Sequence, residues 1–218
     1  MTVDSMDDED QYKTISRKNR IESRVKGSRF IATAFPCFSR QEAERVVNNI
    51  KAEFSDATHN VFAFRVFNER SLEEISDDDG EPASSAGPPI LQRLQGENLL
   101  NAAVVVTRYF GGTELGIGGL IRAYGEAAGR SIKTVEKAEV KKYLKFSCRG
   151  SYNHIGEVIS QLEKREIDIK NRGHCQKGFV LKGEMPLEFE QVLQSELKNI
   201  TGDNVELEII DSFFRRLD

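Results

Sequence analysis

The first half of the chain contains alternating helical and strand-like hydrophobic patterns. Ser39-Arg-Gln-Glu42 is a capping box, and the apolar residues that follow at helical spacing predict an amphipathic helix to about residue 54. Residues 61–67 are apolar on most of both faces, and residues 102–110 contain three consecutive valines, so both segments are predicted to be buried strands. A helix is predicted from Gly118, and its small residues favour close packing on a sheet.

The pattern turns charged from Glu136 to Lys142 and then restarts, which indicates a domain boundary. Beyond it we expect a strand at 143–149, a helix capped by Asn153, strands near 167–172 and from Phe179, a helix opened by Pro186, and a last strand at 205–209. This βαββαβ order is the ferredoxin-like plan, so the chain is predicted to be an α+β protein. The predicted parts are a disordered acidic leader (1–11), a first domain (12–138), a ferredoxin-like domain (139–211) and a tail (212–218).

Composition narrows the class of protein. The chain has 218 residues, 30% of them charged, and a net charge of −4, so it is not an obvious polyanion binder as a whole. No apolar run approaches the roughly 20 residues of a membrane span, and the acidic N-terminus lacks the features of a signal peptide. A cytoplasmic protein without membrane contact is expected. Cys37, Cys148 and Cys175 lie far apart, which argues against a disulfide framework or a zinc site.

Two clusters rich in glycine and polar residues mark the candidate site. They are Ser76–Pro82, within a polar stretch from about Asn68 to Pro89 that is predicted to be a long loop, and Arg108–Tyr124. The glycines of the second cluster precede the predicted helix, where free backbone amides can hold phosphate or carboxylate. They match neither a Walker loop nor a dinucleotide fingerprint. The alternative, which we favour, is that they permit a tight turn and close packing.

The charged residues of these clusters have competing interpretations. Asp78, Asp79 and Glu81 are compatible with a Mg²⁺ or Ca²⁺ site, but they lack the EF-hand pattern, so a solvated acidic turn is favoured and neither metal nor cofactor is predicted. His59 suits general acid or base chemistry, or a hydrogen bond at a strand entrance. Arg108 suits a carboxylate, and pairing inside the protein is slightly favoured over ligand binding.

The second domain carries a basic patch. Lysine and arginine outnumber acids between residues 164 and 182. Lys170 and Arg172 are expected on one side of a strand, and Lys177 and Lys182 are expected on the facing strand or near the turn between the two strands. Such a face could contact an RNA backbone, although aromatic residues for base stacking are sparse. An ordinary solvated sheet face is the alternative. The predicted nucleic-acid-binding residues are Lys170, Arg172, Lys177 and Lys182.

Several strings resemble the YigZ/IMPACT family. They are Ser28-Arg-Phe-Ile-Ala32, Ala57-Thr-His-Asn60, Asp78-Asp-Gly-Glu-Pro82, Ala86-Gly-Pro-Pro-Ile90, Arg108-Tyr-Phe-Gly-Gly112 and Leu115-Gly-Ile-Gly-Gly-Leu-Ile-Arg-Ala-Tyr124. The resemblance covers about residues 12–138. It implies a first domain related to the second domain of a small-subunit ribosomal protein, a second domain similar to one in elongation factor G, and a link to translation. Glu114 stands where the family usually has Lys, which speaks against phosphate binding.

Two functions follow as hypotheses. The first is a non-enzymatic regulator associated with translation, which binds a protein, ribosomal or RNA partner, with its oligomeric state open. The second is an enzyme or ligand-binding protein that holds a phosphorylated small molecule at the glycine-rich loop. In either case we expect one pocket in the first domain, formed by His59, Asp78, Asp79, Glu81, Ser85, Arg108, Gly111, Gly112, Gly116, Gly118, Gly119 and Arg122.

Overall fold

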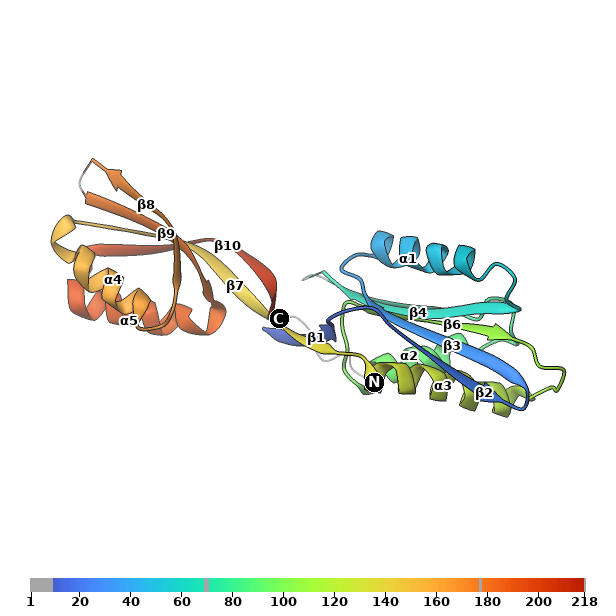
Figure 1. Cartoon of the computed structure of the whole chain (residues 1–218). Helices are drawn as coiled ribbons and strands as arrows, with labels where there is room; N and C mark the ends of the chain where they lie inside the picture. The colour runs from blue at the N-terminus through green and yellow to red at the C-terminus, as the bar shows by residue number, and fades with distance from the viewer. Residues whose placement is uncertain (1–9, 69–70, 177, 218) are drawn as a thin grey trace. The chain divides into compact units, whose positions relative to one another are not determined.

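Figure 1 shows the computed structural model, which describes residues 10–68, 71–176 and 178–217. The chain divides into two compact units, one extending through Glu139 and the other spanning Val140–Leu217. Most of the predicted acidic leader, residues 1–9, lies outside the described residues, and Gln11 already belongs to a strand. Among the described residues, no helix is both long enough and apolar enough to cross a membrane.

The first unit is a five-stranded antiparallel sheet with helices on both faces (Figure 1). Helix α1 (Arg40–Glu53) covers one face, and helices α2 (Gly87–Gly96) and α3 (Ile117–Thr134) cover the other. The strands across the sheet are β2 (Asn19–Val25), β3 (Ser28–Pro36), β6 (Ala102–Tyr109), β4 (His59–Phe67) and β5 (Leu72–Asp77).

The position of strand β6 between two layers of helices explains its run of apolar residues. In β6, Val104 and Val106 pack into the core beneath α2 and α3, whereas Val105 packs into the core beneath α1. A strand covered on both faces is apolar at successive positions, as the consecutive valines predicted. The Ser39 cap is also present, since Ser39 Oγ accepts from the Glu42 amide at 3.1 Å. The Glu42 carboxylate reaches one residue further back than in a standard capping box and accepts from the Phe38 amide at 2.8 Å.

The long loop predicted from Asn68 to Pro89 is wrong in part. Strand β5 occupies Leu72–Asp77 and helix α2 begins at Gly87, so the connection between them is residues 78–86. Strand β5 is an edge strand, paired only with β4, and its residues are half-buried or exposed. An edge strand therefore needs fewer apolar residues than the pattern for a buried strand requires.

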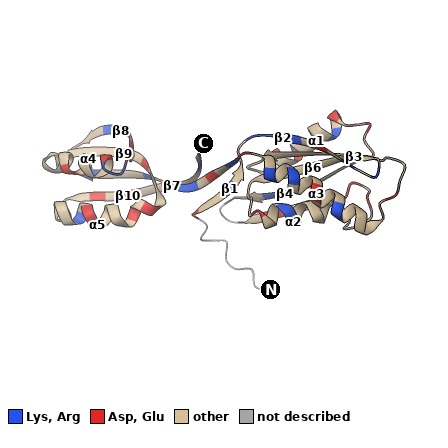
Figure 2. Ribbon diagram, turned by 60° about the horizontal axis from the view of Figure 1, so that its bottom comes forward, with Lys and Arg blue, Asp and Glu red and all other residues tan. Residues whose placement is uncertain are grey.

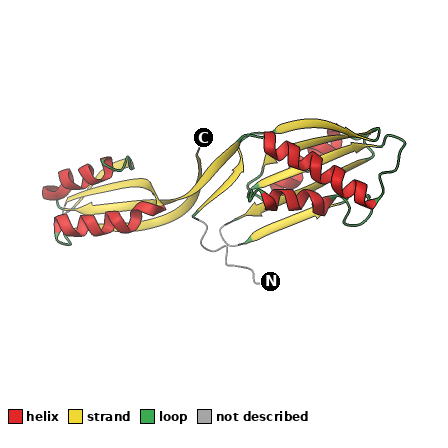
Figure 3. Cartoon of the chain, turned by 90° about the horizontal axis from the view of Figure 1, so that it is seen from below, coloured by secondary structure: helices red, strands yellow, loops and turns green. Residues whose placement is uncertain are grey.

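The second unit has the predicted βαββαβ order. Its elements are β7 (Lys137–Gly150), α4 (Ile155–Glu163), β8 (Asp168–Cys175), β9 (Gly178–Pro186), α5 (Glu190–Thr201) and β10 (Val205–Leu217). The strand order is β10-β7-β9-β8, and both helices lie on one face of the sheet (Figure 3). Strand β7 begins at the end of the first unit, and β1 (Gln11–Ile15) also pairs with it.

Two local predictions for this unit need correction. Residues 212–217 belong to β10 and do not form a tail. The predicted cap at Asn153 is instead part of a short 3-10 helix, Tyr152–His154, and His154 is the N-terminal flanking residue of α4, without a side-chain capping bond. The 3-10 turn takes the place of the cap because it satisfies the His154 amide through the Ser151 carbonyl at 3.0 Å.

Candidate functional site

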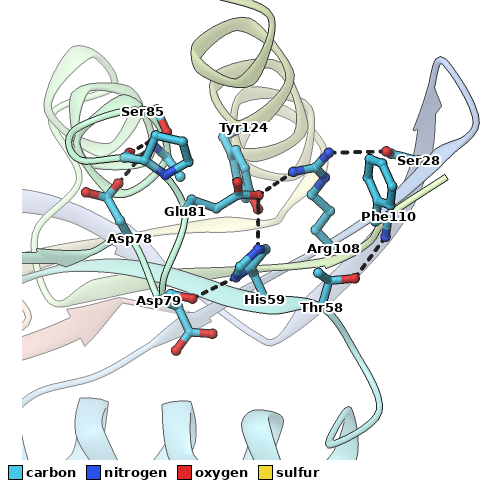
Figure 4. A network of polar contacts seen from close by, with 12 residues as sticks. Ser28, Thr58, His59, Asp78, Asp79, Glu81, Ser85, Arg108, Phe110 and Tyr124 are labelled. Atoms are coloured by element: carbon cyan, nitrogen blue, oxygen red, sulfur yellow. Dashed lines mark hydrogen bonds and ion pairs between the residues drawn. The ribbon is translucent and has the colours of Figure 1, made fainter. Parts of the chain in front are cut away.

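A polar cluster forms where β4, β6, α3 and the 78–86 loop of the first unit meet (Figure 4). His59 and Arg108 are directly opposite each other on β4 and β6, so their side chains emerge on the same face of the sheet. Glu81 reaches this face from the loop, and Tyr124 reaches it from α3. We call these four residues, His59, Glu81, Arg108 and Tyr124, the Glu81 cluster.

Glu81 is the centre of the cluster. Its Oε1 accepts a hydrogen bond from Arg108 Nη1 at 2.5 Å and another from the Tyr124 hydroxyl at 2.7 Å. The Arg108 and Glu81 side chains are only 6% and 4% exposed, so this is a buried ion pair. Burial, with a smaller effect of Glu81, raises the pKa of Tyr124, which keeps the hydroxyl protonated and able to donate. The internal pairing favoured for Arg108 is therefore present.

His59 lies at the edge of the cluster with one ring nitrogen engaged. Its Nδ1 is 2.7 Å from the Asp79 carbonyl oxygen, and a carbonyl can only accept, so Nδ1 carries the proton. Its Nε2 faces Glu81 Oε1 at 3.9 Å. The His59 side chain is 21% exposed and lines the pocket described below, and Nε2 is the ring nitrogen that has no hydrogen-bond partner among the described residues.

The other two acids and the serine of the predicted site stabilise the 78–86 loop. Asp78 Oδ1 accepts from the amides of Ala86 and Gly87, at 2.9 and 2.8 Å, and thereby caps helix α2. The Asp79 carboxylate points away from Glu81 in Figure 4 and accepts from Lys51 at 2.5 Å and from the Asn60 amide at 2.6 Å. Ser85 Oγ donates to the Pro82 carbonyl. The prediction that Asp78, Asp79 and Ser85 line the pocket is therefore wrong. Their hydrogen bonds instead hold the 78–86 loop in place.

A pocket of about 440 Å³ opens beside the Glu81 cluster. Its rim is apolar and accessible: the Phe110 and Ile117 side chains are 49% and 62% exposed. We call it the Glu81 pocket, and its lining residues are Thr58, His59, Glu81, Pro82, Arg108, Phe110, Glu114, Leu115, Gly116, Ile117 and Leu120.

Of the predicted glycines, Gly116 alone is among the lining residues of this pocket. Gly116 precedes α3 with a φ of 67°, a conformation that favours glycine. Gly111 has a packing role: a Cβ there would lie 2.0 Å from the carbonyl carbon of Gly27. Gly112, Gly118, Gly119 and Arg122 are outside the lining as well, so the glycine-rich segment forms one edge of the pocket and not its floor.

Sequence reasoning did not assign several residues of the site. Tyr124 is not among the predicted pocket residues, but its ring packs edge-to-face on Phe30 while its hydroxyl reaches Glu81. Phe110, Leu115 and Ile117 form the rim. The available signal was three large apolar side chains inside a glycine-rich stretch that has no regular period of its own.

The basic patch of the second unit is not arranged as predicted. Arg172 is opposite Leu181 and Asn171 is opposite Lys182, so the side chains of Arg172 and Lys182 lie on opposite faces of the sheet. The register shifts at Lys170, which forms an ion pair with Asp168. A bulge of this kind reverses the expected alternation. Lys177 lies outside the described residues.

Basic and acidic residues also form ion pairs on strands β7, β9 and β10 of the same sheet; Figure 2 colours the two types of residue. Lys145 pairs with Asp211 at 3.2 Å, Arg149 pairs with Glu208 at 3.4 Å, and Arg215 pairs with Glu184. Exposed pairs of this kind are worth little in stability, but they reduce the positive potential that a nucleic-acid backbone would meet.

The chain is similar to known proteins in sequence and in fold. Residues 26–132 match the family described as the Impact N-terminal domain. The chain is 34% identical to IMPACT family member YvyE of Bacillus subtilis, over 73% of each protein. It is 29% identical to IMPACT family member YigZ of Escherichia coli over 72% of this chain and 76% of that protein. A crystal structure described as a hypothetical protein is similar with a TM-score of 0.64 and 25% identity, over 93% of this chain and 98% of that one.

Proposed function

The chain belongs to the IMPACT family, and from this premise we propose that it is a non-enzymatic regulatory protein associated with translation. In this proposal the first unit binds a protein or ribosomal partner through the Glu81 pocket. The expected relationships of the two units to a small-subunit ribosomal protein and to elongation factor G belong to the same proposal, since either relationship would suit a protein that acts near the ribosome.

One observation carries this proposal: the Arg108 cation of the pocket is already paired with Glu81, while the apolar rim of the pocket is exposed. Arg108 and Tyr124 both donate to Glu81 Oε1, and the Arg108 and Glu81 side chains are buried. Phe110 and Ile117 are 49% and 62% exposed and line the same pocket, and exposed apolar side chains that are grouped in this way mark interaction sites. Protein interfaces are enriched in such residues, particularly aromatic ones.

The second hypothesis, an enzyme or binding protein for a phosphorylated small molecule, has less support. The positive charge of Arg108 is already matched by Glu81 at 2.5 Å, and Arg122 is not among the residues that line the pocket. Glu114 adds a negative charge to the lining, which would repel a phosphate. An RNA contact through Lys170, Arg172, Lys177 and Lys182 likewise has less support, because Arg172 and Lys182 lie on opposite faces.

The proposal is tested by affinity capture from lysate with the tagged full chain. Ile117→Asp is the informative variant, because it removes an exposed apolar contact but places an acid at the first position of α3, where an acid is favourable for the helix. Val192→Asp is the matched control, since Val192 is 49% exposed on α5 of the second unit.

We expect a partner that both the unchanged chain and Val192→Asp capture and that Ile117→Asp loses. Capture that survives RNase indicates a protein contact, whereas capture that RNase abolishes would indicate that the contact is made through RNA. Equal capture by all three proteins would overturn the role of the pocket.

A further inference from the structure

The Glu81 pocket has the features of a receptor for a positively charged side chain. Resting on the proposed function, we infer that its occupant is an arginine or lysine of a partner protein segment. The alkyl stem of that residue would lie along the apolar rim, and its charged group would reach His59, Glu81 and Glu114.

The floor of the pocket offers hydrogen-bond acceptors. Both hydrogen bonds that Glu81 receives from Arg108 and Tyr124 end on Oε1, and no described residue donates to Oε2. His59 donates through Nδ1, so its Nε2 is an acceptor in the neutral ring. A group that is rich in N–H donors and lacks acceptors complements this pair, and guanidinium and ammonium are the side-chain groups of that kind.

The charge of the lining favours a cation in the same way. Glu81 and Arg108 cancel each other, and Glu114 then contributes a full negative charge. The start of α3 at Gly116 opposes it with roughly half a positive charge, which leaves a negative balance. Arg108 Nε is buried without a hydrogen-bond partner in the described part of the chain, but it is sealed from solvent and cannot serve an anionic ligand.

The walls of the Glu81 pocket can accommodate the alkyl part of an arginine or lysine side chain. Pro82, Phe110, Leu115 and Ile117 provide apolar surface beside the acceptors, and long basic side chains bury their methylene groups on surface of this type while the charge stays hydrated or paired. The pocket volume of about 440 Å³ lies within the range of sites that enclose small organic groups.

The test is an NMR titration of the ¹⁵N-labelled full chain. The probe is Nα-acetylarginine methylamide, followed at the Gly116 and Ile117 amides, which border the pocket. Nα-acetylcitrulline methylamide is the matched ligand control, because it keeps the shape of arginine but replaces the guanidinium with a neutral urea. Inorganic phosphate is the third probe, since it represents the competing anionic class.

We expect saturable shifts at Gly116 and Ile117 with the arginine probe, and none with citrulline or phosphate. Glu114→Gln should weaken the arginine probe about two- to fivefold, as expected for an exposed ion pair. Glu126→Gln is the matched control, because Glu126 is an exposed acid on α3 outside the pocket lining, and it should leave the affinity unchanged.

The inference is overturned if phosphate shifts these amides in place of arginine, if citrulline binds as well as arginine, or if none of the probes shifts them. Failure here leaves the proposed function standing when Ile117→Asp still loses a captured partner, since that partner would then present another kind of side chain. Arginine binding without any partner that depends on Ile117 would instead retain the preference of the pocket for a cationic side chain and reject the proposed function, and with it a partner protein as the source of that side chain.

Discussion

The Arg108→Ala variant tests whether the Glu81 cluster holds the first unit together. Removing the guanidinium leaves the Glu81 carboxylate in a place where its side chain is 4% exposed, with the Tyr124 hydroxyl as its remaining hydrogen-bond donor among the described residues. Breaking one side of a buried ion pair in this way costs about 3–5 kcal/mol, because an uncompensated charge remains. The guanidinium carbon also lies 5.6 Å from the ring centroids of Phe30 and Phe110, and loss of these contacts adds to the cost.

The measurement is differential scanning calorimetry of the full chain, because two compact units can unfold in separate transitions. The transition of the first unit should shift strongly, while that of the second unit stays in place. Arg122→Ala is the matched control: Arg122 is an exposed arginine on α3 outside the pocket lining, so its removal should change stability by less than about 0.5 kcal/mol.

A double variant distinguishes the cost of the unpaired Glu81 charge from the cost of lost packing. Glu81→Gln combined with Arg108→Met removes both charges, keeps an oxygen for the Tyr124 hydroxyl and retains apolar bulk, so it should recover most of the stability lost by Arg108→Ala. A loss below about 1 kcal/mol for Arg108→Ala, similar to Arg122→Ala, would refute the buried ion pair as a stabilising element.

Four further predictions concern the cap of α2, the buried thiols, the dependence of stability on pH and the second unit. Asp78→Ala should destabilise the first unit by about 1–2 kcal/mol in calorimetry because α2 loses its cap, whereas Asp78→Asn should retain most of that stability. Burial raises the pKa of Cys37 and Cys148 to about 12, so near pH 8 a thiol reagent should label the exposed Cys175 rapidly and the other two only after unfolding; a fast phase that persists in Cys175→Ser would contradict this. Because those two thiols ionise near 9.0 once unfolded, stability should also fall as the pH rises above about 9. The fragment Val140–Leu217 has its own apolar core and should unfold cooperatively by itself, and a fragment without a calorimetric transition would contradict separate folding.

Local sequence patterns predicted the elements that bury a face against a core. The capping box at Ser39, the consecutive valines of β6 and the periodic residues of the second unit each report the surroundings of their own segment, and the structure contains the corresponding elements. Strand β5 was not predicted, because an edge strand buries little apolar surface and its polar sequence therefore resembles that of a loop. The candidate site was located through family strings, since its charged residues have no periodic signal.

Sequence by itself therefore determined the α+β composition, the βαββαβ order of the second unit and the neighbourhood of the site. Tertiary structure decided which acid pairs with Arg108, because that choice depends on the register that sets His59 opposite Arg108 and on a loop that returns Glu81 from 27 residues away. It also decided that Arg172 and Lys182 face opposite ways, since one shift of register reverses every side chain beyond it. Periodicity records whether a residue is buried, whereas the identity of its partner depends on how distant segments align.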